Sequence, residues 1–342
     1  MVKPNSNFIT VSSQNSCSTF KGIAGSVQCN PALFPFMDLA TLQFQSIGKA
    51  EGDSVDAGRK LIFDPISKEF LESLFSENSL ISFNFDSNIN FYTNYFLVTY
   101  SPYYLIGDVY ILNPAFPEIS MFLNKQSSLK MTSGYDLSEY TPFEGDIFSV
   151  GMSLFRRSRE VFAGSILLTD FAQDDDGIVE FEDKSELGTD IGFFYESSSS
   201  FLSPKISLQA KNLFTLSKVN NSRLDSSSDL ETFLIFEPYS QLGLGSSYLS
   251  SFGEIYVGME FPFDGVFESI YIDYISGSIN YSLNSFMGTI GISKYFKTLG
   301  LYFTSDLGSV GIIYSNENEL AGKNIDHLET QNSIYIQLDI KL

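Results

Sequence analysis

Apolar and polar residues alternate with a period of two along most of the chain. The pattern is clearest at the C-terminus, where Ile334, Ile336, Leu338, Ile340 and Leu342 are separated by Tyr335, Gln337, Asp339 and Lys341. Side chains of a β-strand point alternately to opposite faces, so one face of this strand is aliphatic and the other is wet. The same alternation recurs over residues 81–86, 148–154, 206–211, 254–261, 286–293 and 299–304. The sequence therefore predicts an all-β fold.

Alternation alone fits a soluble β-sandwich as well as a membrane barrel. Three features favour the barrel. The polar faces are rich in Gly, Ser and Thr and poor in Lys and Glu. Many segments have the length of roughly nine to eleven residues that a tilted strand needs to cross a bilayer. Tyrosines lie near segment ends, as at Tyr92, Tyr100, Tyr195 and Tyr248, which suits interfacial aromatic girdles. We predict a closed antiparallel transmembrane β-barrel.

The predicted organisation is one barrel over residues 38–342 after an N-terminal segment of residues 1–37. At roughly 22 residues per strand and connection, and with the even strand number of bacterial barrels, we expect about 14 strands within a range of about 12 to 16. One helix is predicted between the first two strands, over residues 64–76, where apolar residues recur at spacings of three and four.

Composition limits the possible partners. The chain has 20 Lys and Arg against 41 Asp and Glu, a formal net charge of −21, which disfavours nucleic acid. Apolar runs such as residues 95–98 are far too short for a membrane-spanning helix. The first residues lack the apolar core of a signal peptide. Because the barrel favours export, we expect the signal to have been removed and the protein to lie in the outer membrane of a bacterial cell.

The two cysteines, Cys17 and Cys29, are 12 residues apart near the N-terminus. A disulfide, which implies an oxidising compartment, is favoured over two buried thiols. A zinc site needs four ligands, and the single histidine, His327, lies about 300 residues away.

The small-residue stretch from Gly22 to Leu33, with Asn30, Pro31 and Ala32 near its end, resembles the segment that precedes the first strand of FadL-like barrels. Shorter similarities lie at residues 149–157, 188–195, 206–213 and 242–248. That superfamily includes FadL-type channels for hydrophobic compounds, PorV secretion barrels and TraF-like barrels. The resemblance implies 14 strands and an N-terminal hatch or plug inside the lumen. The cysteine pair departs from the family and would staple such a hatch, which puts transport by hatch movement in doubt.

Catalysis has little support, and we expect no enzyme activity and no cofactor. His327 lies in a polar segment without an identifiable nucleophile, so a solvated loop histidine is favoured. An EF-hand register would place Asp174, Asp176, Glu180 and Asp183 at ligand positions. It also places Ala172 where a carboxylate is required, so an acidic surface loop is favoured over a calcium site.

The alternation predicts which side chains line the lumen. These candidates are Asp86, Glu254, Tyr256, Glu260, Asp273 and Asp339. An open acidic lumen would favour cations, whereas an interior network of ion pairs would pack the lumen, and we favour the network. Arg156, Arg157 and Arg159 are expected together at one hairpin, where they could pair with acidic neighbours or lipid phosphates.

Two functions remain open. The first is a passive outer-membrane channel for hydrophobic or other small molecules. The second is a barrel without transport that serves as scaffold, receptor or secretion-system partner. The expected partners are outer-membrane lipid and lipopolysaccharide, together with a hydrophobic ligand or an envelope protein.

Overall fold

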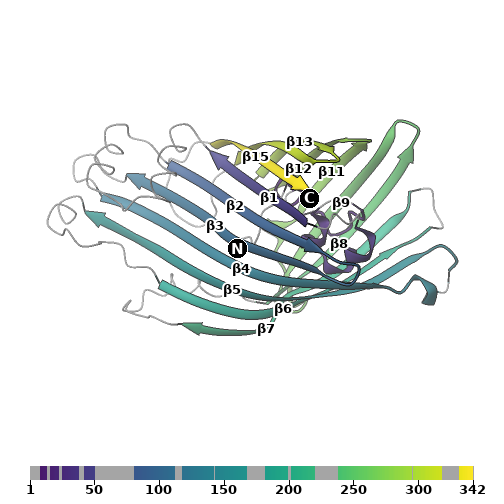
Figure 1. Ribbon diagram of the computed structural model, residues 1–342, viewed down its shortest axis with the longest axis horizontal. Coiled ribbons are helices and arrows are strands. Elements are labelled where there is room, and N and C mark those ends of the chain that lie inside the picture. Colours follow the sequence, from purple (N-terminus) through teal and green to yellow (C-terminus); the bar gives the residue numbers. More distant parts are fainter. Residues whose placement is uncertain are drawn as a thin grey trace.

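The strands of the chain join edge to edge into a ring (Figure 1). The computed structural model describes residues 8–13, 16–22, 25–37, 42–50, 81–111, 118–141, 143–167, 182–198, 202–219, 238–294, 296–317 and 331–341. Within these residues fifteen strands form one sheet in the order β10-β9-β11-β12-β13-β14-β15-β1-β2-β3-β4-β5-β6-β7-β8, and a further pairing of β8 with β9 closes it. Leaving out β10, which pairs only with β9, the ring has 14 strands, as predicted.

The ring strands are antiparallel to their neighbours throughout. They are β1 (Leu42–Ala50), β2 (Ile81–Tyr92), β3 (Leu97–Ile111), β4 (Glu118–Asp136), β5 (Ile147–Leu167), β6 (Glu182–Glu196), β7 (Pro204–Val219), β8 (Tyr239–Ser250), β9 (Gly253–Asp264), β11 (Ser276–Leu283), β12 (Phe286–Ser293), β13 (Phe296–Ser305), β14 (Gly308–Glu317) and β15 (Gln331–Lys341). The remaining elements are β10 (Ser269–Ile270) and the short helices α1 (Phe8–Ser12), α2 (Ser26–Cys29), η1 (Pro31–Phe36), η2 (Ser138–Tyr140) and η3 (Ile272–Tyr274).

The C-terminal alternation forms β15, which closes the ring against β1 from the pair Gln43 and Lys341 to the pair Ala50 and Ile334. The six upstream alternating segments lie in β2, β5, β7, β9, β12 and β13, so these strand predictions are confirmed. The predicted helix at residues 64–76 lies outside the described residues.

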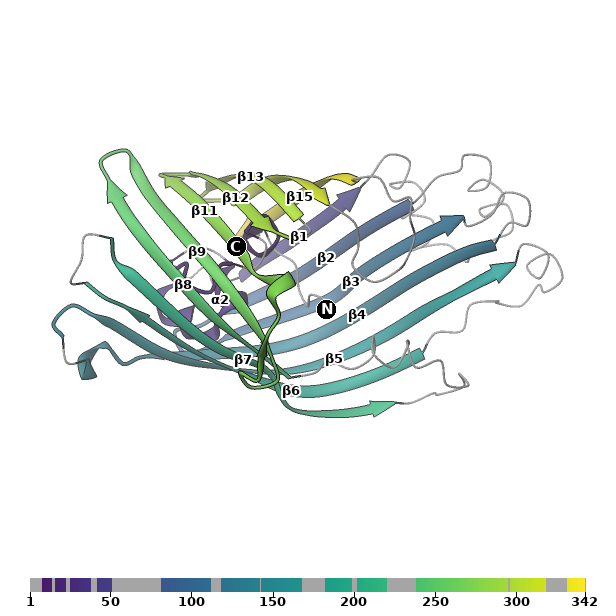
Figure 2. The ribbon, with the colours of Figure 1, turned by 180° about the vertical axis from the view of Figure 1, so that it is seen from behind.

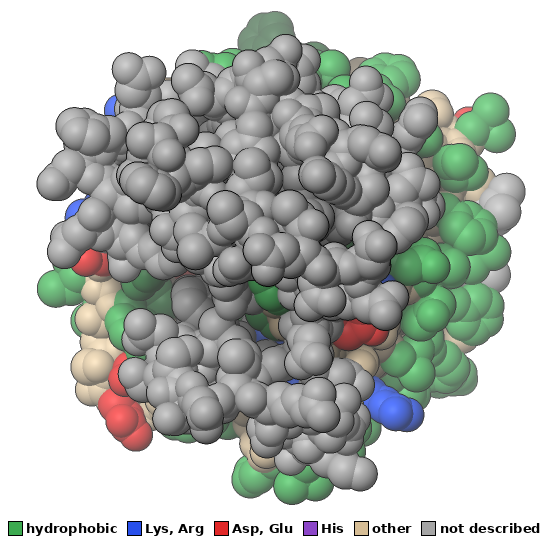
Figure 3. All heavy atoms as spheres, turned by 90° about the vertical axis from the view of Figure 1, so that its left-hand side faces the viewer, with side chains coloured by type: hydrophobic (Ala, Val, Ile, Leu, Met, Phe, Trp, Pro, Cys, Tyr) green, Lys and Arg blue, Asp and Glu red, His purple; other side chains and the backbone are tan. Residues whose placement is uncertain are grey.

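The outer face of the ring is an apolar belt, and the inner face is polar. On β15, Leu338 is 51% exposed while its neighbour Asp339 is 1% exposed. Ile312, Leu301 and Ile290 on the adjoining strands are also half exposed. Hydrophobic side chains gather in a band along the right-hand edge of the molecule in Figure 3. This is the surface that a transmembrane β-barrel presents to lipid. Among the described residues, no helix is long and apolar enough to cross a membrane.

The connections differ between the two ends of the barrel. At one end, here called the turn end, they comprise residues 93–96, 137–146, 197–203, 251–252, 284–285 and 306–307. At the other, here called the loop end, they comprise residues 51–80, 112–117, 168–181, 220–238, 265–275, 294–295 and 318–330. The described N-terminal residues, with α2 labelled, lie within the ring toward the turn end (Figure 2).

The wall is also uneven in height. Strands β3 to β7 have between 15 and 21 residues, whereas β11 to β14 have between 8 and 10. The long strands extend toward the loop end well beyond the short ones (Figure 1).

Candidate functional site

The described residues between Phe8 and Met37, here called the N-terminal segment, pack against the inner wall. Ala32 and Leu33 are fully buried and cluster with Phe194 of β6. Ile9 and Phe20 cluster with inward side chains of the opposite wall, among them Tyr256, Met287 and Ile313. The segment therefore contacts both sides of the lumen.

A line of glycines makes room for the segment on one side. Gly134 of β4 is register partner of Gly151 of β5, which is register partner of Gly192 of β6. A Cβ atom added to Gly151 would lie 2.3 Å from the carbonyl oxygen of Pro31, and one added to Gly192 would lie 2.0 Å from Oδ1 of Asn30. A side chain at these positions would occupy the space that Asn30 and Pro31 fill. We call Gly134, Gly151 and Gly192 the glycine line.

Glycines serve the same purpose on the other side of the lumen. A Cβ atom added to Gly243 of β8 would lie 2.1 Å from Oγ of Ser18, and one added to Gly258 of β9 would lie 2.8 Å from the carbonyl oxygen of Ser16. The glycines of the wall thus leave room for backbone and side-chain atoms of the segment.

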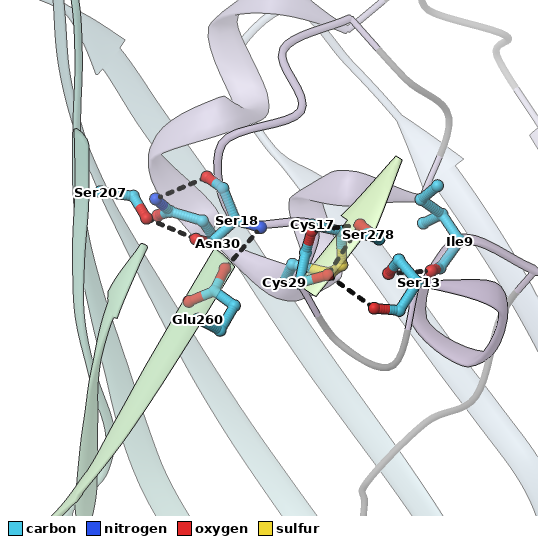
Figure 4. Close-up of a disulfide and its surroundings, with 10 residues drawn as sticks. Ile9, Ser13, Cys17, Ser18, Cys29, Asn30, Ser207, Glu260 and Ser278 are labelled. Atoms are coloured by element: carbon cyan, nitrogen blue, oxygen red, sulfur yellow. Dashed lines mark hydrogen bonds between the residues drawn. A yellow bond between two sulfur atoms is a disulfide. The ribbon is translucent and has the colours of Figure 1, made fainter. Parts of the chain in front are cut away.

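Hydrogen bonds join the segment to six strands of the wall, and Figure 4 shows those to Ser207, Glu260 and Ser278. The backbone N–H of Ser18 donates to Oε1 of Glu260 at 2.9 Å, and the hydroxyl of Ser18 bonds to that of Ser207. The hydroxyl of Ser16 donates to that of Ser278 at 2.7 Å. The other bonds run from Ser149 Oγ to Ala32 O at 2.7 Å, from Thr298 Oγ1 to Ser12 O at 2.6 Å, and from Asn30 Nδ2 to Phe193 O at 3.1 Å.

Asn30 and the disulfide fix the shape of the segment. The Asn30 side chain accepts from Ala32 N at 3.0 Å and so caps η1, which has Pro31 at its first position. Cys17 and Cys29 are bonded, as predicted, and both are buried. The disulfide joins the part of the segment at β9 and β11 to the part at the glycine line.

An ion pair adds to these contacts at the turn end. Nζ of Lys21 lies 2.5 Å from Oε2 of Glu196 at the end of β6, and Lys205 of β7 approaches the other carboxylate oxygen at 3.7 Å. Lys205 also lies 4.8 Å from the ring centre of Tyr256. The segment is thus held by charge as well as by fit.

Four of the six predicted lumen-lining residues lie on β9 and β15. Tyr256 and Glu260 on β9 contact the N-terminal segment, through the Phe20 ring at 5.8 Å and through Ser18. Glu254 is half-buried on the same face of β9. Asp339 accepts hydrogen bonds from Tyr302 and Gln337.

The other two candidates lie apart from these. Asp86 is fully buried on β2. Asp273 lies in η3 between β10 and β11, where it is exposed and pairs with Lys294 at 2.6 Å. Asp273 is therefore not on a strand of the wall, because the chain leaves the sheet between Ile270 and Ser276 and period-two alternation no longer applies there.

Sequence reasoning favoured an interior network of ion pairs but did not place charged residues on the inner faces of β4, β5 and β6, where Lys130 pairs with Asp190 and Lys184 with Glu186. Arg157 and Arg159 are buried within β5, and Arg156 is on the outer face. The prediction that these arginines lie together at a hairpin is wrong, since β5 runs unbroken to Leu167. The signal was present: extending the alternation from Phe148 to Leu154 by five residues places Arg157 and Arg159 on the inner face.

The calcium candidates Asp174, Asp176 and Glu180 lie outside the described residues, as do His327 and the side chain of Asp183. Among the residues that are described, no three His, Cys, Asp or Glu side chains are grouped to hold a metal ion.

No known protein family matches the chain by sequence, and no curated protein matches it. Solved structures resemble it in part. CdiB from Escherichia coli aligns with a TM-score of 0.40 and 11% identity over 89% of this chain and 63% of that one. CdiB from Acinetobacter baumannii aligns with a TM-score of 0.37 and 8% identity over 89% and 60%. The translocator domain of autotransporter NalP from Neisseria meningitidis aligns with a TM-score of 0.31 and 11% identity over 89% and 90%.

The chain thus spans less than two thirds of the length of the two CdiB chains. LpxR from Salmonella typhimurium aligns with a TM-score of 0.31 at 6% identity over 88% and 100%. The barrel assignment rests on the strand pairing described above, and membership of the FadL-like superfamily stays a prediction.

Proposed function

We propose that the protein is a passive channel of the bacterial outer membrane and that the N-terminal segment closes this channel at the turn end. The observation that carries the proposal is the fit between the segment and the glycine line. Because the wall has glycine at the positions that face Asn30 and Pro31, the N-terminal segment can pack directly against the strands there.

The number of strands in the ring also supports the proposal, because it implies a lumen wide enough to need a segment that closes it. About 8 strands give an interior that side chains fill, whereas about 16 to 18 strands leave an aqueous channel. A ring of 14 strands is closer to the second case. Its own side chains would leave a passage at the turn end, which the segment occupies.

The unequal connections give the orientation. Bacterial barrels have short periplasmic turns and longer loops on the outside of the cell. The turn end then faces the periplasm, and the N-terminal segment enters the lumen from that side. The apolar belt would contact lipid, and the loop end would meet lipopolysaccharide.

The proposal is tested by measuring conductance in planar bilayers. The variant Gly192→Val places a side chain where Oδ1 of Asn30 lies, so we expect it to unseat the segment and raise the conductance above that of the unaltered protein. The control is Gly48→Val on the outer face of β1, where an added Cβ atom meets only the Phe85 ring at 3.8 Å. We expect this control to conduct like the unaltered protein.

The second candidate is a barrel without transport that serves as scaffold, receptor or secretion-system partner. The disulfide between Cys17 and Cys29 favours it, because a cross-linked segment is less free to rearrange. If Gly192→Val folds, inserts and remains silent under reducing and non-reducing conditions, the channel proposal fails and this candidate replaces it.

A further inference from the structure

Lys21 is the one charged residue in the sequence from Phe8 to Met37, although 18% of the whole chain is charged. Its Nζ atom lies 2.5 Å from Oε2 of Glu196, which is the last residue of β6. The hydrogen bonds between the segment and the wall that are described above use neutral hydroxyl, amide and carbonyl groups of the segment. The ion pair is therefore the contact at which a charge of the segment meets a charge of the wall.

Lys21 lies at a partly exposed edge of the segment. The four residues before it, 17–20, are at most 1% exposed, whereas the Lys21 side chain is 26% exposed. The backbone N–H of Phe20 donates to the carbonyl oxygen of Cys17 at 3.1 Å, so the chain turns just before Lys21, and the disulfide fixes the first residue of that turn. Nζ of Lys21 also lies 5.7 Å from the ring centre of Phe36 in the same segment. The segment thus presents its ammonium group at a defined place at the turn end.

Glu196 is held in place by the wall itself. Nζ of Lys205 lies 3.7 Å from its other carboxylate oxygen, and the Lys205 side chain is only 1% exposed. Lys205 is itself fixed above the ring of Tyr256 and interacts with Glu254. A buried charge that loses its partner is costly, but Glu196 keeps Lys205 as a partner if the segment leaves. The wall therefore offers Lys21 an acceptor whose position does not depend on the segment.

We infer that Glu196 is a positioning residue for closure of the channel, and that it holds the N-terminal segment in its seat through Lys21. This inference rests on the proposed closure of the channel by the segment. An ion pair that is mostly shielded from water is screened less than one on the open surface. Because this pair lies at the edge of the seat, its loss should let the segment lift more often while the pairing of the strands stays unchanged.

The test measures hydrogen exchange at the Ser18 amide of the full chain in lipid vesicles. This amide donates to Glu260 on the wall, so its exchange reports departure of the segment from its seat. The variant Lys21→Met keeps an apolar side chain of similar length beside Phe36 and removes the charge. We expect it to accelerate exchange at Ser18 by about threefold to tenfold. Conductance in planar bilayers should rise in the same variant.

Three further variants separate the charge from the packing. Lys21→Arg keeps the positive charge and should exchange like the unaltered protein. Glu196→Gln should accelerate exchange as Lys21→Met does, and the two substitutions together should add little to either alone, because both break one pair. The matched control is Lys125→Met, which removes the cation of an exposed pair with Glu160 at 2.9 Å on the outer face of β4. It should change neither exchange at Ser18 nor conductance.

The outcomes distinguish this inference from the channel proposal. Unchanged exchange at Ser18 in Lys21→Met, or fully additive effects of Lys21→Met and Glu196→Gln, overturns the inference and leaves the channel standing, because Gly192→Val tests the channel separately. Absence of conductance from every folded variant, Gly192→Val included, overturns the channel proposal and this inference together.

Discussion

Oδ1 of Asn30 lies only 2.0 Å from the point where any residue other than glycine at position 192 would place its Cβ atom. The N-terminal segment and the wall of β6 therefore cannot both keep their places if Gly192 acquires a side chain. The two positions are 162 residues apart in the sequence, and strand pairing and the path of the segment bring them together.

The first prediction concerns the stability of this contact. We expect Gly192→Ala to lower the free energy of unfolding by about 1–3 kcal/mol, because the added methyl group overpacks a filled space. Gly48→Ala, with 3.8 Å to its nearest neighbour, should not lower it. Urea titration of the protein in lipid vesicles gives both values. Equal stability of the two variants would contradict the close fit at Gly192.

The second prediction concerns the disulfide. Replacing Cys17 and Cys29 with serine removes a cross-link over a separation of 12 residues, so the folded N-terminal segment should lose about 3 kcal/mol relative to its unfolded state. Limited proteolysis should then cut the segment faster while the strands stay intact. Unaltered protein treated with a reducing agent should behave in the same way, and the double serine variant should not respond to that agent.

The third prediction concerns acid sensitivity at the turn end. Asp146, between η2 and β5, accepts a hydrogen bond from the Tyr195 hydroxyl and one from Ser198 N at 2.9 Å. These bonds lower the pKa of Asp146 from its ordinary value of 3.8. A carboxyl group with a lowered pKa in the folded state stabilises the fold above its ordinary pKa, and the contribution is lost as the pH falls through the folded pKa.

Hydrogen exchange measures this effect at one amide. Exchange at Ser198 N–H, corrected for intrinsic rate, should accelerate as the pH falls from about 5 to about 2. In Asp146→Asn the neutral amide cannot titrate, so the corrected rate should not change over that range. A parallel acid response in both proteins would assign the effect to another group.

The fourth prediction concerns the apolar belt. Ile336 lies at the middle of β15 between Gly48 and Ile312 and is 59% exposed. We expect Ile336→Lys to destabilise folding into phospholipid vesicles by about 2–4 kcal/mol, and Leu307→Lys, in a turn outside the strands, by about 0–1 kcal/mol. If the two costs were alike, the belt would be misplaced.

Much of the fold could be predicted because successive side chains of a strand point to opposite faces, so lipid-facing and lumen-facing residues alternate in the sequence. The alternation from Ile334 to Ile340 contains both the lipid face and the lumen face of β15. The disulfide between Cys17 and Cys29 could also be predicted, since the chain has no other cysteine with which either could pair.

The site was less predictable, because it depends on register between strands. Gly134, Gly151 and Gly192 form a line only once β4, β5 and β6 are aligned, and no spacing within one strand shows this. The same holds for the inward-facing residues Lys130, Arg157 and Lys184, which lie on three different strands. Asp273 was placed on the wall because its local pattern resembles a strand, whereas the chain forms η3 there.

The unequal height of the wall sets how the molecule stands in a membrane. The 21 residues of β5, tilted as in other barrels, rise roughly 50 Å, whereas a hydrocarbon belt is about 25 Å tall. The exposed pair of Lys125 and Glu160 lies on the outer face of β4 and β5. The eight residues of β12 rise only roughly 20 Å. In the proposed orientation, a solute or partner that moves along the cell surface meets a high rim on the side of β5 and a low one on the side of β12, so the direction of its approach matters.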